Sequence, residues 1–383
     1  MKSRRRLVFI TTGLLTGGAE MMLWHLLTRL PRSDFEPIVV SLRAEGPMRS
    51  RFEQAGITVC SPEMNPAVPN PLAWWRLLRL VRALQPDILQ GWMYHANVAA
   101  SWCSRFLKDT RLFFSIHNSI YRLEDEKFIT GLVIKRGAAL SPRTERVIYC
   151  AHSTASQHEA LGYSPQRTLV IPNGFDTDIF KPDPEARQLL RGELKASSDT
   201  LLMGLIARFD PHKDHETFFA AARLVADALP EARFVLAGKG VDPSNSILAH
   251  LTARHSLQEH VCLLGERRDI PAIMAGLDVL ISSSSSEALP SVVGEALACE
   301  VPCVVTDVGD SKVLASSGGQ VVPPRDPKAL AQAAIEIGRR PPQERQALGA
   351  SGRAHIVRNF SISTMVRAYS DLYSSGNQSN KAV

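Results

Sequence analysis

The sequence is informative first for what it lacks. None of its 383 residues falls in an unbroken apolar run of about 18 residues, so we expect no transmembrane helix. Its six cysteines are scattered without Cys or His neighbours at metal-ligand spacing, which favours reduced, buried thiols in a cytoplasmic protein. An Asp-x-Asp pair is missing from the strand ends, so a metal-bound diphosphate is not indicated. We therefore predict neither a metal site nor a bound cofactor.

The fingerprint of nicotinamide-binding proteins is also missing. Gly17 and Gly18 follow an expected strand over 7–12 and open a helix, but their spacing is not GxGxxG. An acidic residue that ends a second strand about twenty residues later is likewise absent. Glycines permit close backbone approach, and a helix N-terminus favours anions. This stretch fits either a phosphate-binding turn or a bare tight turn.

Length and periodicity predict two α/β domains. A chain of 383 residues exceeds the usual size of one domain. Strand-like and helix-like segments alternate in both halves, which is typical of parallel sheets covered on both faces. The pattern pauses near 172–176, residues 181–184 are expected to be a linker, and the alternation restarts at 201–206. The expected strands lie at 7–12, 37–42, 57–60, 87–90, 112–116, 146–150, 201–206, 233–237, 261–264, 279–281 and 302–305.

Charge is unevenly spread along the chain. The net charge is +6, yet residues 1–170 hold 22 Lys and Arg and 13 Asp and Glu, a balance of +9. A basic half can meet an acidic acceptor or an anionic membrane face, or it can be a solvated surface. A helix expected over 72–84 carries Trp74, Trp75, Arg76, Arg79 and Arg82. We therefore hypothesise peripheral attachment to a membrane.

The segment 287–295 places two carboxylates around a helix start. An apolar strand precedes it, serines form a loop, and Pro290 suits the first turn of a helix. Glu287 then lies on the loop at the carboxyl end of the strand, and Glu295 lies within the helix. The backbone N–H groups between them suit phosphate, and the carboxylates suit sugar or ribose hydroxyls. The alternative is a capped helix with two solvated acids.

Other strand ends carry cations, a glycine and a histidine. Arg208 offers a fork for paired phosphate oxygens and Lys213 a point charge, so both could carry a pyrophosphate leaving group. Exposed surface charge is the alternative. Gly238 lets the backbone lie flat beside a nucleotide base. His117 could bond a substrate hydroxyl or be a structural histidine.

Taken jointly, these stretches resemble the large family of retaining GT-B glycosyltransferases, family 4-like, that includes bacterial mannosyltransferases and sucrose synthases. The resemblance spans nearly the whole chain, and its most specific mark is a pair of glutamates, Glu287 and Glu295, with seven residues between them. It is carried by 17–20 (GGAE), 171–176 (IPNGFD), Arg208 with Lys213, 237–240 (AGKG), 264–265 (LG), 287–299, 301–302 (VP), 306–310 (TDVGD) and 321–324 (VVPP). In this family a glycine usually stands where this chain has Glu300.

The resemblance implies a fold and a domain plan. Two doubly wound Rossmann-like α/β domains would face an interdomain cleft. Residues 1–172 would form the acceptor-side domain and 173–359 the donor-binding domain. Residues 360–383 would form a helix that crosses back to the first domain, followed by a tail.

The resemblance also implies roles at matching positions. Glu287 would sit beside the donor sugar, Arg208 and Lys213 would stabilise charge on the leaving diphosphate, and His117 would contact the sugar. Glu295 would bind the ribose hydroxyls. The remaining donor-binding residues would be Gly17, Gly18, Gly238, Leu289, Pro290, Ser291 and Val292.

The implied activity is metal-independent transfer of a hexosyl group from a nucleotide-diphosphate sugar to a hydroxyl of a lipid-linked or saccharide acceptor. The setting would be the assembly of surface polysaccharide, lipopolysaccharide or glycolipid. Retention would follow from front-face attack. We expect a cytoplasmic protein, peripheral on the inner face of the cell membrane, with no nucleic acid partner. A sugar-nucleotide epimerase on a similar fold, or a non-catalytic sugar-nucleotide-binding subunit, is the alternative.

Overall fold

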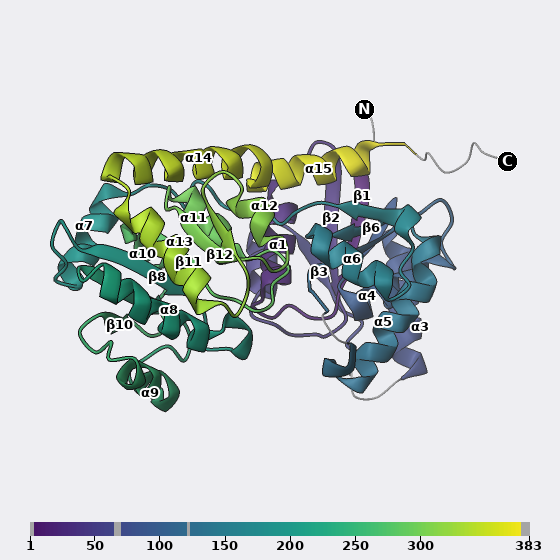
Figure 1. Ribbon diagram of the computed structural model, residues 1–383. Helices are drawn as coiled ribbons and strands as arrows, with labels where there is room; N and C mark the ends of the chain where they lie inside the picture. Colours follow the sequence, from purple (N-terminus) through teal and green to yellow (C-terminus); the bar gives the residue numbers. More distant parts are fainter. Residues whose placement is uncertain (1–3, 65–69, 121–122, 377–383) are drawn as a thin grey trace. The chain divides into compact units, whose positions relative to one another are not determined.

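Two parallel sheets organise the chain in the computed structural model, which describes residues 4–64, 70–120 and 123–376 (Figure 1). The chain divides into two compact units. Unit 1 comprises Met1–Gly174 and Ile362–Val383, and unit 2 comprises Phe175–Ser361. Among the described residues, unit 1 holds a seven-stranded sheet and unit 2 a six-stranded sheet.

Unit 1 alternates short strands with helices. Its strands are β1 (Arg5–Thr11), β2 (Phe35–Ser41), β3 (Thr58–Cys60), β4 (Ile88–Trp92), β5 (Arg111–Ile116), β6 (Arg146–Tyr149) and β7 (Thr168–Val170). Its α-helices are α1 (Gly18–Arg29), α2 (Arg49–Gln54), α3 (Pro71–Leu84), α4 (Tyr94–Ser104), α5 (Phe128–Leu140), α6 (His152–Ala160) and α15 (Ile362–Ser374). The strand order is β3-β2-β1-β4-β5-β6-β7, with parallel pairing throughout.

Unit 2 repeats this plan. Its strands are β8 (Leu201–Ile206), β9 (Ala232–Ala237), β10 (Val261–Leu263), β11 (Val279–Ser282), β12 (Cys303–Thr306) and β13 (Gly319–Val322). Its α-helices are α7 (Pro184–Glu193), α8 (His215–Ala228), α9 (Ser246–Arg254), α10 (Ile270–Gly276), α11 (Ser291–Ala298), α12 (Ser311–Ala315), α13 (Pro327–Arg339) and α14 (Pro342–Phe360). The strand order is β10-β9-β8-β11-β12-β13.

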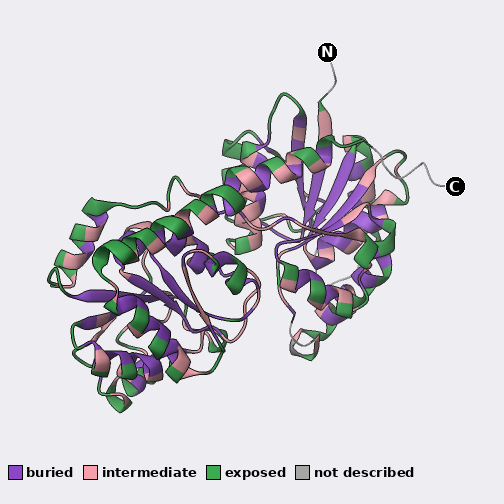
Figure 2. Ribbon diagram, turned by 45° about the horizontal axis from the view of Figure 1, so that its top comes forward, coloured by how far each residue is buried: buried purple, intermediate pink, exposed green. Residues whose placement is uncertain are grey.

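Each sheet is buried on both faces, as Figure 2 shows by the purple strands and the green outer surfaces of the helices. In unit 1, Val8 and Ile10 pack towards α3, α4, α5 and α6, whereas Leu7 and Phe9 pack towards α1, α2 and α15. In unit 2, β8 is buried along its whole length, which explains its continuous apolar sequence LLMGLI. The two faces of the unit 2 sheet have separate apolar clusters.

Some elements escaped the sequence pattern. β7 and β13 are short strands at sheet edges, half-buried for most of their length, so they lack a strong apolar signal. The stretch 181–184 was expected to be a linker, but α7 begins within it because Asp183 caps the helix and Pro184 fits its first position. Pro290 was expected inside the first helical turn. It instead occupies the N-cap of α11, with φ −67° and ψ 110°.

A helix that crosses a membrane must be long and predominantly apolar. Within the described ranges, none of the helices is long and apolar enough to cross a bilayer.

Candidate functional site

The strand order of unit 2 marks where a ligand would bind. In its order β10-β9-β8-β11-β12-β13, the sequence direction of the sheet reverses between β8 and β11. Ligands of open α/β sheets bind outside the carboxyl ends of the strands at such a switch point. The segments that follow β8 and β11 contain Arg208, Lys213 and Glu287. The structure therefore places these three residues at one edge of the unit 2 sheet.

Lys213 and Glu287 form the central contact of this edge. Lys213 ends the short 3₁₀ helix η4 (Pro211–Lys213), and its Nζ lies 2.5 Å from Oε1 of Glu287. The lysine and glutamate side chains are 22% and 12% exposed, so the pair is largely shielded from water. An ammonium group has three N–H donors, so Lys213 can bind Glu287 and still donate to an anion. The pair thus offers a carboxylate and a cation side by side.

The serine run after β11 holds these loops together. The hydroxyl of Ser284 donates to Oε1 of Glu287 at 2.7 Å, and that of Ser283 donates to the carbonyl of Lys213 at 2.8 Å. The hydroxyl of Thr306, at the end of β12, donates to the carbonyl of Ser284 at 2.5 Å. From the sequence, these serines were expected only to form a loop. Their position directly before Glu287 was the available signal.

Gly309 closes the other side of the Glu287 loop. It has φ +56°, and a Cβ there would lie 2.4 Å from the carbonyl oxygen of Glu287. The next residue, Asp310, donates its backbone N–H to the carbonyl of Ala288 at 2.8 Å. Only glycine combines this backbone conformation with this close approach. The stretch 306–310 therefore supports the loop that carries Glu287.

The helix α11 begins directly after this loop. Ser291 and Val292 are its first residues, so their backbone N–H groups have no partner within the helix and suit an anion. Glu295 follows on the same helix and is half-buried. Burial raises the pKa of the Glu295 carboxyl to about 7, although a hydrogen bond with Ser291 opposes the shift. Glu295 is thus partly protonated at neutral pH.

Phe175 fixes the position of α11. A Cβ at Gly294 would lie 2.2 Å from the phenyl ring of Phe175, which is 5% exposed. The ring therefore packs directly on the helix backbone beside Glu295. Phe175 belongs to the 171–176 stretch, and this contact gives that motif a structural reason.

Arg208 and Gly238 occupy the ends of β8 and β9. The guanidinium of Arg208 is 68% exposed and binds the Asp210 carboxylate at 3.0 Å. Gly238 has φ +152°, and a Cβ there would lie 2.0 Å from the carbonyl oxygen of Ala207. Gly238 is therefore required already by the neighbouring strand end, whether or not a nucleotide lies against it.

His117 lies in unit 1, at the end of β5. In the tautomer that satisfies both contacts, its Nδ1–H donates to Oδ1 of Asn173 at 2.9 Å, and Nε2 accepts from the hydroxyl of Ser115 at 2.8 Å. The ring stacks on Trp92 with centroids 4.3 Å apart. Burial lowers the pKa of His117 to about 4, so the imidazole is neutral at neutral pH. To contact a sugar, it would have to exchange one of these two hydrogen bonds.

Gly17 and Gly18 also lie in unit 1, where α1 begins. Gly17 is the N-cap, and a Cβ on it would lie 2.5 Å from Oε2 of Glu20. The Glu20 carboxylate accepts a hydrogen bond from its own backbone N–H, and burial raises its pKa. This carboxylate is the end of a flexible side chain that can move aside, so the contact does not by itself require glycine at position 17. A Cβ at Gly18 would have nothing within 4 Å. The order of the unit 1 sheet reverses between β1 and β4, so this turn lies at a switch point.

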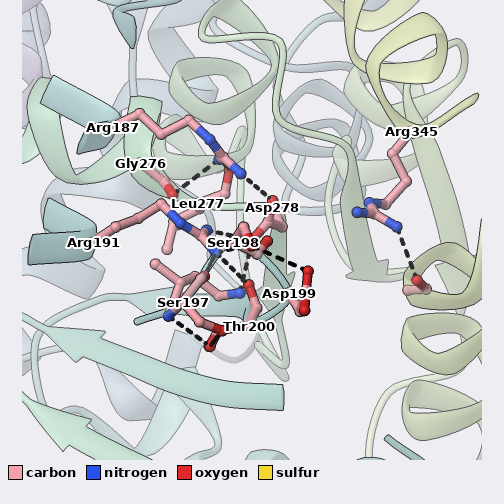
Figure 3. A network of polar contacts seen from close by, with 12 residues as sticks. Arg187, Arg191, Ser197, Ser198, Asp199, Thr200, Gly276, Leu277, Asp278 and Arg345 are labelled. Atoms are coloured by element: carbon pink, nitrogen blue, oxygen red, sulfur yellow. Dashed lines mark hydrogen bonds and ion pairs between the residues drawn. The ribbon is translucent and has the colours of Figure 1, made fainter. Parts of the chain in front are cut away.

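A further polar cluster lies at the opposite edge of the unit 2 sheet (Figure 3). Asp278 precedes β11 and binds Arg187 at 2.5 Å and Arg191 at 3.2 Å. It also accepts the backbone N–H of Leu202 at 2.8 Å. Arg187 and Arg191 additionally donate to several backbone carbonyls. These contacts tie α7 to the amino ends of β8 and β11, so we assign the cluster a structural role.

In residues 4–64, 70–120 and 123–376, no group of three or more His, Cys, Asp or Glu side chains is placed to hold a metal ion.

Solved structures define the class of protein to which this architecture belongs. A crystal structure of HepE from Anabaena in complex with UDP matches with a TM-score of 0.84 at 22% identity, covering 97% of this chain and 100% of that chain. A glycosyltransferase from Rickettsia africae matches with a TM-score of 0.81 at 18% identity, covering 97% and 98% of the two chains. The fold is that of the GT-B glycosyltransferases, as the sequence predicted.

Sequence comparisons define the family. A model described as Glycosyltransferase Family 4 matches residues 16–179, and one described as Glycosyl transferases group 1 matches residues 200–339. The UDP-Gal:alpha-D-GlcNAc-diphosphoundecaprenol alpha-1,3-galactosyltransferase of Escherichia coli is 22% identical over 303 residues, which are 78% of this chain and 77% of that protein. The lipopolysaccharide core biosynthesis mannosyltransferase LpsB of Rhizobium meliloti is 26% identical over 228 residues, 58% of this chain and 64% of that protein. The chain belongs to the family 4, or group 1, glycosyltransferases.

Proposed function

We propose that the protein is a retaining, metal-independent glycosyltransferase that moves a hexosyl group from a nucleoside-diphosphate sugar to a hydroxyl acceptor. The acceptor is a saccharide or a lipid-linked saccharide in the assembly of surface polysaccharide, lipopolysaccharide or glycolipid. The names of relatives support this setting, because one uses UDP-galactose on a diphosphoundecaprenol-linked sugar and another acts in lipopolysaccharide core biosynthesis. HepE, which shares the fold, was crystallised with UDP and with UDP-glucose.

The observation that carries the proposal is the Lys213–Glu287 pair at the β8/β11 switch point. It lies directly before α11, whose first N–H groups suit phosphate. The cations Lys213 and Arg208 would face the diphosphate, and the Glu287 carboxylate would accept hydrogen bonds from sugar hydroxyls. Glu295 would bind the ribose hydroxyls. Phosphate oxygens would thus meet cations and N–H donors, and sugar hydroxyls would meet carboxylate acceptors.

The same groups explain how the bond would break. As the bond between the anomeric carbon and the phosphate oxygen lengthens, negative charge grows on the diphosphate, and Arg208 and Lys213 stabilise it. The acceptor hydroxyl attacks from the face that the diphosphate leaves, and its proton passes to a phosphate oxygen. Configuration is therefore retained without the paired carboxylates of glycosidases. Because the protein's own cations supply the charge stabilisation, the reaction needs no divalent metal.

The proposal is tested by measuring nucleoside diphosphate release with purified protein, a panel of nucleotide sugars and candidate acceptors. Glu287→Ala and Arg208→Ala are each expected to lower kcat/KM at least about 100-fold. The matched controls are Glu336→Ala and Arg340→Ala, an ion pair of α13 whose side chains are 58% and 34% exposed, and they should leave the rate unchanged. Intact transfer in both site variants would refute the assignment.

Two further readouts separate the alternatives. An epimerase would convert the donor without net release of nucleoside diphosphate. A binding subunit would show a donor-dependent thermal shift without turnover. Retention of full activity in EDTA is expected for a metal-independent enzyme, and loss of activity that Mg²⁺ restores would contradict that part of the proposal.

A cytoplasmic location with peripheral attachment to the inner membrane face completes the proposal. Its support is the +9 balance of residues 1–170 and the neighbouring tryptophans and arginines of α3. Such an attachment would bring the enzyme to a lipid-linked acceptor.

A further inference from the structure

A cavity of about 610 Å³ opens on the face of unit 1 where α3, α4 and α5 lie beside one another (Figure 1). Three of the five tryptophans of the chain line it: Trp74 and Trp75 from α3 and Trp102 from α4. The rings of Trp74 and Trp102 meet edge to face with centroids 5.1 Å apart. The volume is in the range of ligand pockets, roughly 300–1,000 Å³. The walls are mainly hydrocarbon and aromatic, so they suit an apolar ligand.

Exposed apolar side chains continue from this cavity along α5. Arg136 and Leu140 line the cavity, and Leu132 and Phe128 lie one and two turns before Arg136 on the same helix face. Phe128 is 80% exposed and Leu132 is 51% exposed. On α3, Trp75 is also 53% exposed. This extended apolar patch is costly to leave in water, so it indicates a surface that meets an apolar phase or partner.

Both charged residues that line the cavity are arginines. The sequences of α3, α4 and α5 contain five Arg or Lys and no Asp or Glu. Arg105, which follows α4, and Arg136 line the cavity themselves, and Arg79 lies over the ring of Trp75 at 5.5 Å. Arginine stems can cover apolar surface while the guanidinium groups reach a charged layer. Apolar walls and a cationic rim together fit an amphiphile with an anionic head.

We infer that this cavity takes one hydrocarbon chain of an anionic membrane phospholipid, while Arg105 and Arg136 bind its phosphate. A lipid fits better than a protein helix because aromatic residues with flanking cations are typical of the membrane interface, where the basic charge meets anionic headgroups. The inference deepens the proposed peripheral attachment by placing it at a defined pocket. It does not depend on the donor chemistry, so it can fail while sugar transfer stands.

The test uses the whole chain with vesicles of phosphatidylglycerol and phosphatidylcholine whose acyl chains carry bromine, which quenches tryptophan fluorescence on contact. Because Trp74, Trp75 and Trp102 line the cavity, insertion of a chain should quench much of the intrinsic fluorescence. Vesicles of phosphatidylcholine alone should bind far more weakly. Arg105→Glu combined with Arg136→Glu should weaken binding to the mixed vesicles at least about tenfold.

A matched double variant makes the same change of charge elsewhere. Lys328→Glu with Arg339→Glu alters two exposed residues of α13 in unit 2 and should leave vesicle binding unchanged. Val98→Phe fills the cavity from α4 and should reduce the bromine quenching by at least about half, while sedimentation with vesicles persists through the basic rim. Circular dichroism and nucleotide-induced thermal shifts confirm that each variant is folded.

Three outcomes would overturn the inference. Sedimentation with vesicles but no quenching by brominated chains would show surface adsorption only. Equal weakening by the unit 1 and unit 2 charge variants would show an effect of net charge. A dimer in light scattering that Trp75→Ala abolishes, without vesicle binding, would assign the patch to a second copy of the chain.

Discussion

Lys213 and Glu287 are 74 residues apart in sequence, yet Nζ and Oε1 lie 2.5 Å apart at the edge where β8 and β11 end. The pair joins the loop that follows one strand to the loop that follows its spatial neighbour. It therefore links the cation proposed for the diphosphate to the carboxylate proposed for the sugar. Removing either partner should change both stability and donor binding.

The first prediction concerns this pair. Lys213→Met keeps most of the side-chain volume but leaves Glu287 without its cation, so the free energy of unfolding should fall by about 1–3 kcal/mol. Nucleotide affinity should fall as well, because a phosphate-binding charge is lost. Urea denaturation and calorimetric titration with the nucleoside diphosphate measure the two effects. A double-mutant cycle with Glu287→Gln should give a clear coupling energy, and strict additivity would contradict a direct interaction.

The second prediction concerns pH. Burial raises the pKa of Glu295 to about 7, and ribose hydroxyls are bound best by the ionised carboxylate. Nucleotide affinity should therefore increase as the pH rises from 6 to 8. Glu295→Gln should remove this dependence and bind more weakly at pH 8. Calorimetric titrations at several pH values test this, and identical pH profiles for both proteins would contradict the ribose assignment.

The stability of the folded protein should change in the opposite direction, between about pH 4.5 and 7. The pKa of Glu295 is raised from its ordinary value of 4.5, so the folded state holds its proton more tightly than the unfolded state. This contribution to stability is full below pH 4.5 and is lost as the pH rises through 7. The unfolding free energy of the unmodified protein, measured relative to that of Glu295→Gln, should therefore fall as the pH rises from about 4.5 to 7.

The third prediction concerns Glu300. It follows the C-cap of α11 and has φ +61°, the left-handed region where glycine is favoured. Glu300→Gly should therefore raise the free energy of unfolding by about 0.5–1 kcal/mol, since relief of backbone strain exceeds the added entropy of the unfolded chain. Glu300→Ala is the control and should give no gain, because it keeps the Cβ. Thermal and urea unfolding of the three proteins compare them.

The fourth prediction concerns Gly294. An alanine there would bring its methyl group 2.2 Å from the Phe175 ring, which is buried and cannot move freely. Gly294→Ala should destabilise the protein by about 1–3 kcal/mol and weaken nucleotide binding through displacement of α11. Phe175→Leu in the Gly294→Ala background should recover part of the loss. A loss that the smaller side chain does not relieve would rule out this contact as the cause.

Much of the fold could be predicted because the buried strands are short apolar runs with helices between them. Leu201–Ile206 was located to the residue, since both of its faces are covered and every side chain is apolar. Strands β7 and β13 could not be found in this way, because TLV and GQVV are short, partly buried and mix polar with apolar residues. The unexpected start of α7 shows that an Asp-Pro pair signals a helix start as readily as a linker.

The candidate site was predicted less completely. Glu287, Arg208 and Lys213 stand at strand ends, and their meeting at one edge follows from parallel pairing. The hydroxyl contacts of Ser283, Ser284 and Thr306 depend on side-chain directions that sequence does not specify. For Gly17 and Gly238, the sequence indicated close approach, but the approaching groups are Glu20 and the Ala207 carbonyl of the protein itself. Their contact with a donor stays a prediction.

Unit 1 begins first in the chain, yet part of it follows unit 2. Unit 2 is an insertion in unit 1, because the chain leaves unit 1 after Gly174 and re-enters it at Ile362. These two residues are neighbours, since a Cβ on Gly174 would lie 2.6 Å from the Cα of Ile362. Helix α15, which covers one face of the unit 1 core with Tyr369 and Tyr373, is made after unit 2. On the ribosome, unit 2 can therefore finish folding while the sheet of unit 1 still exposes an uncovered face.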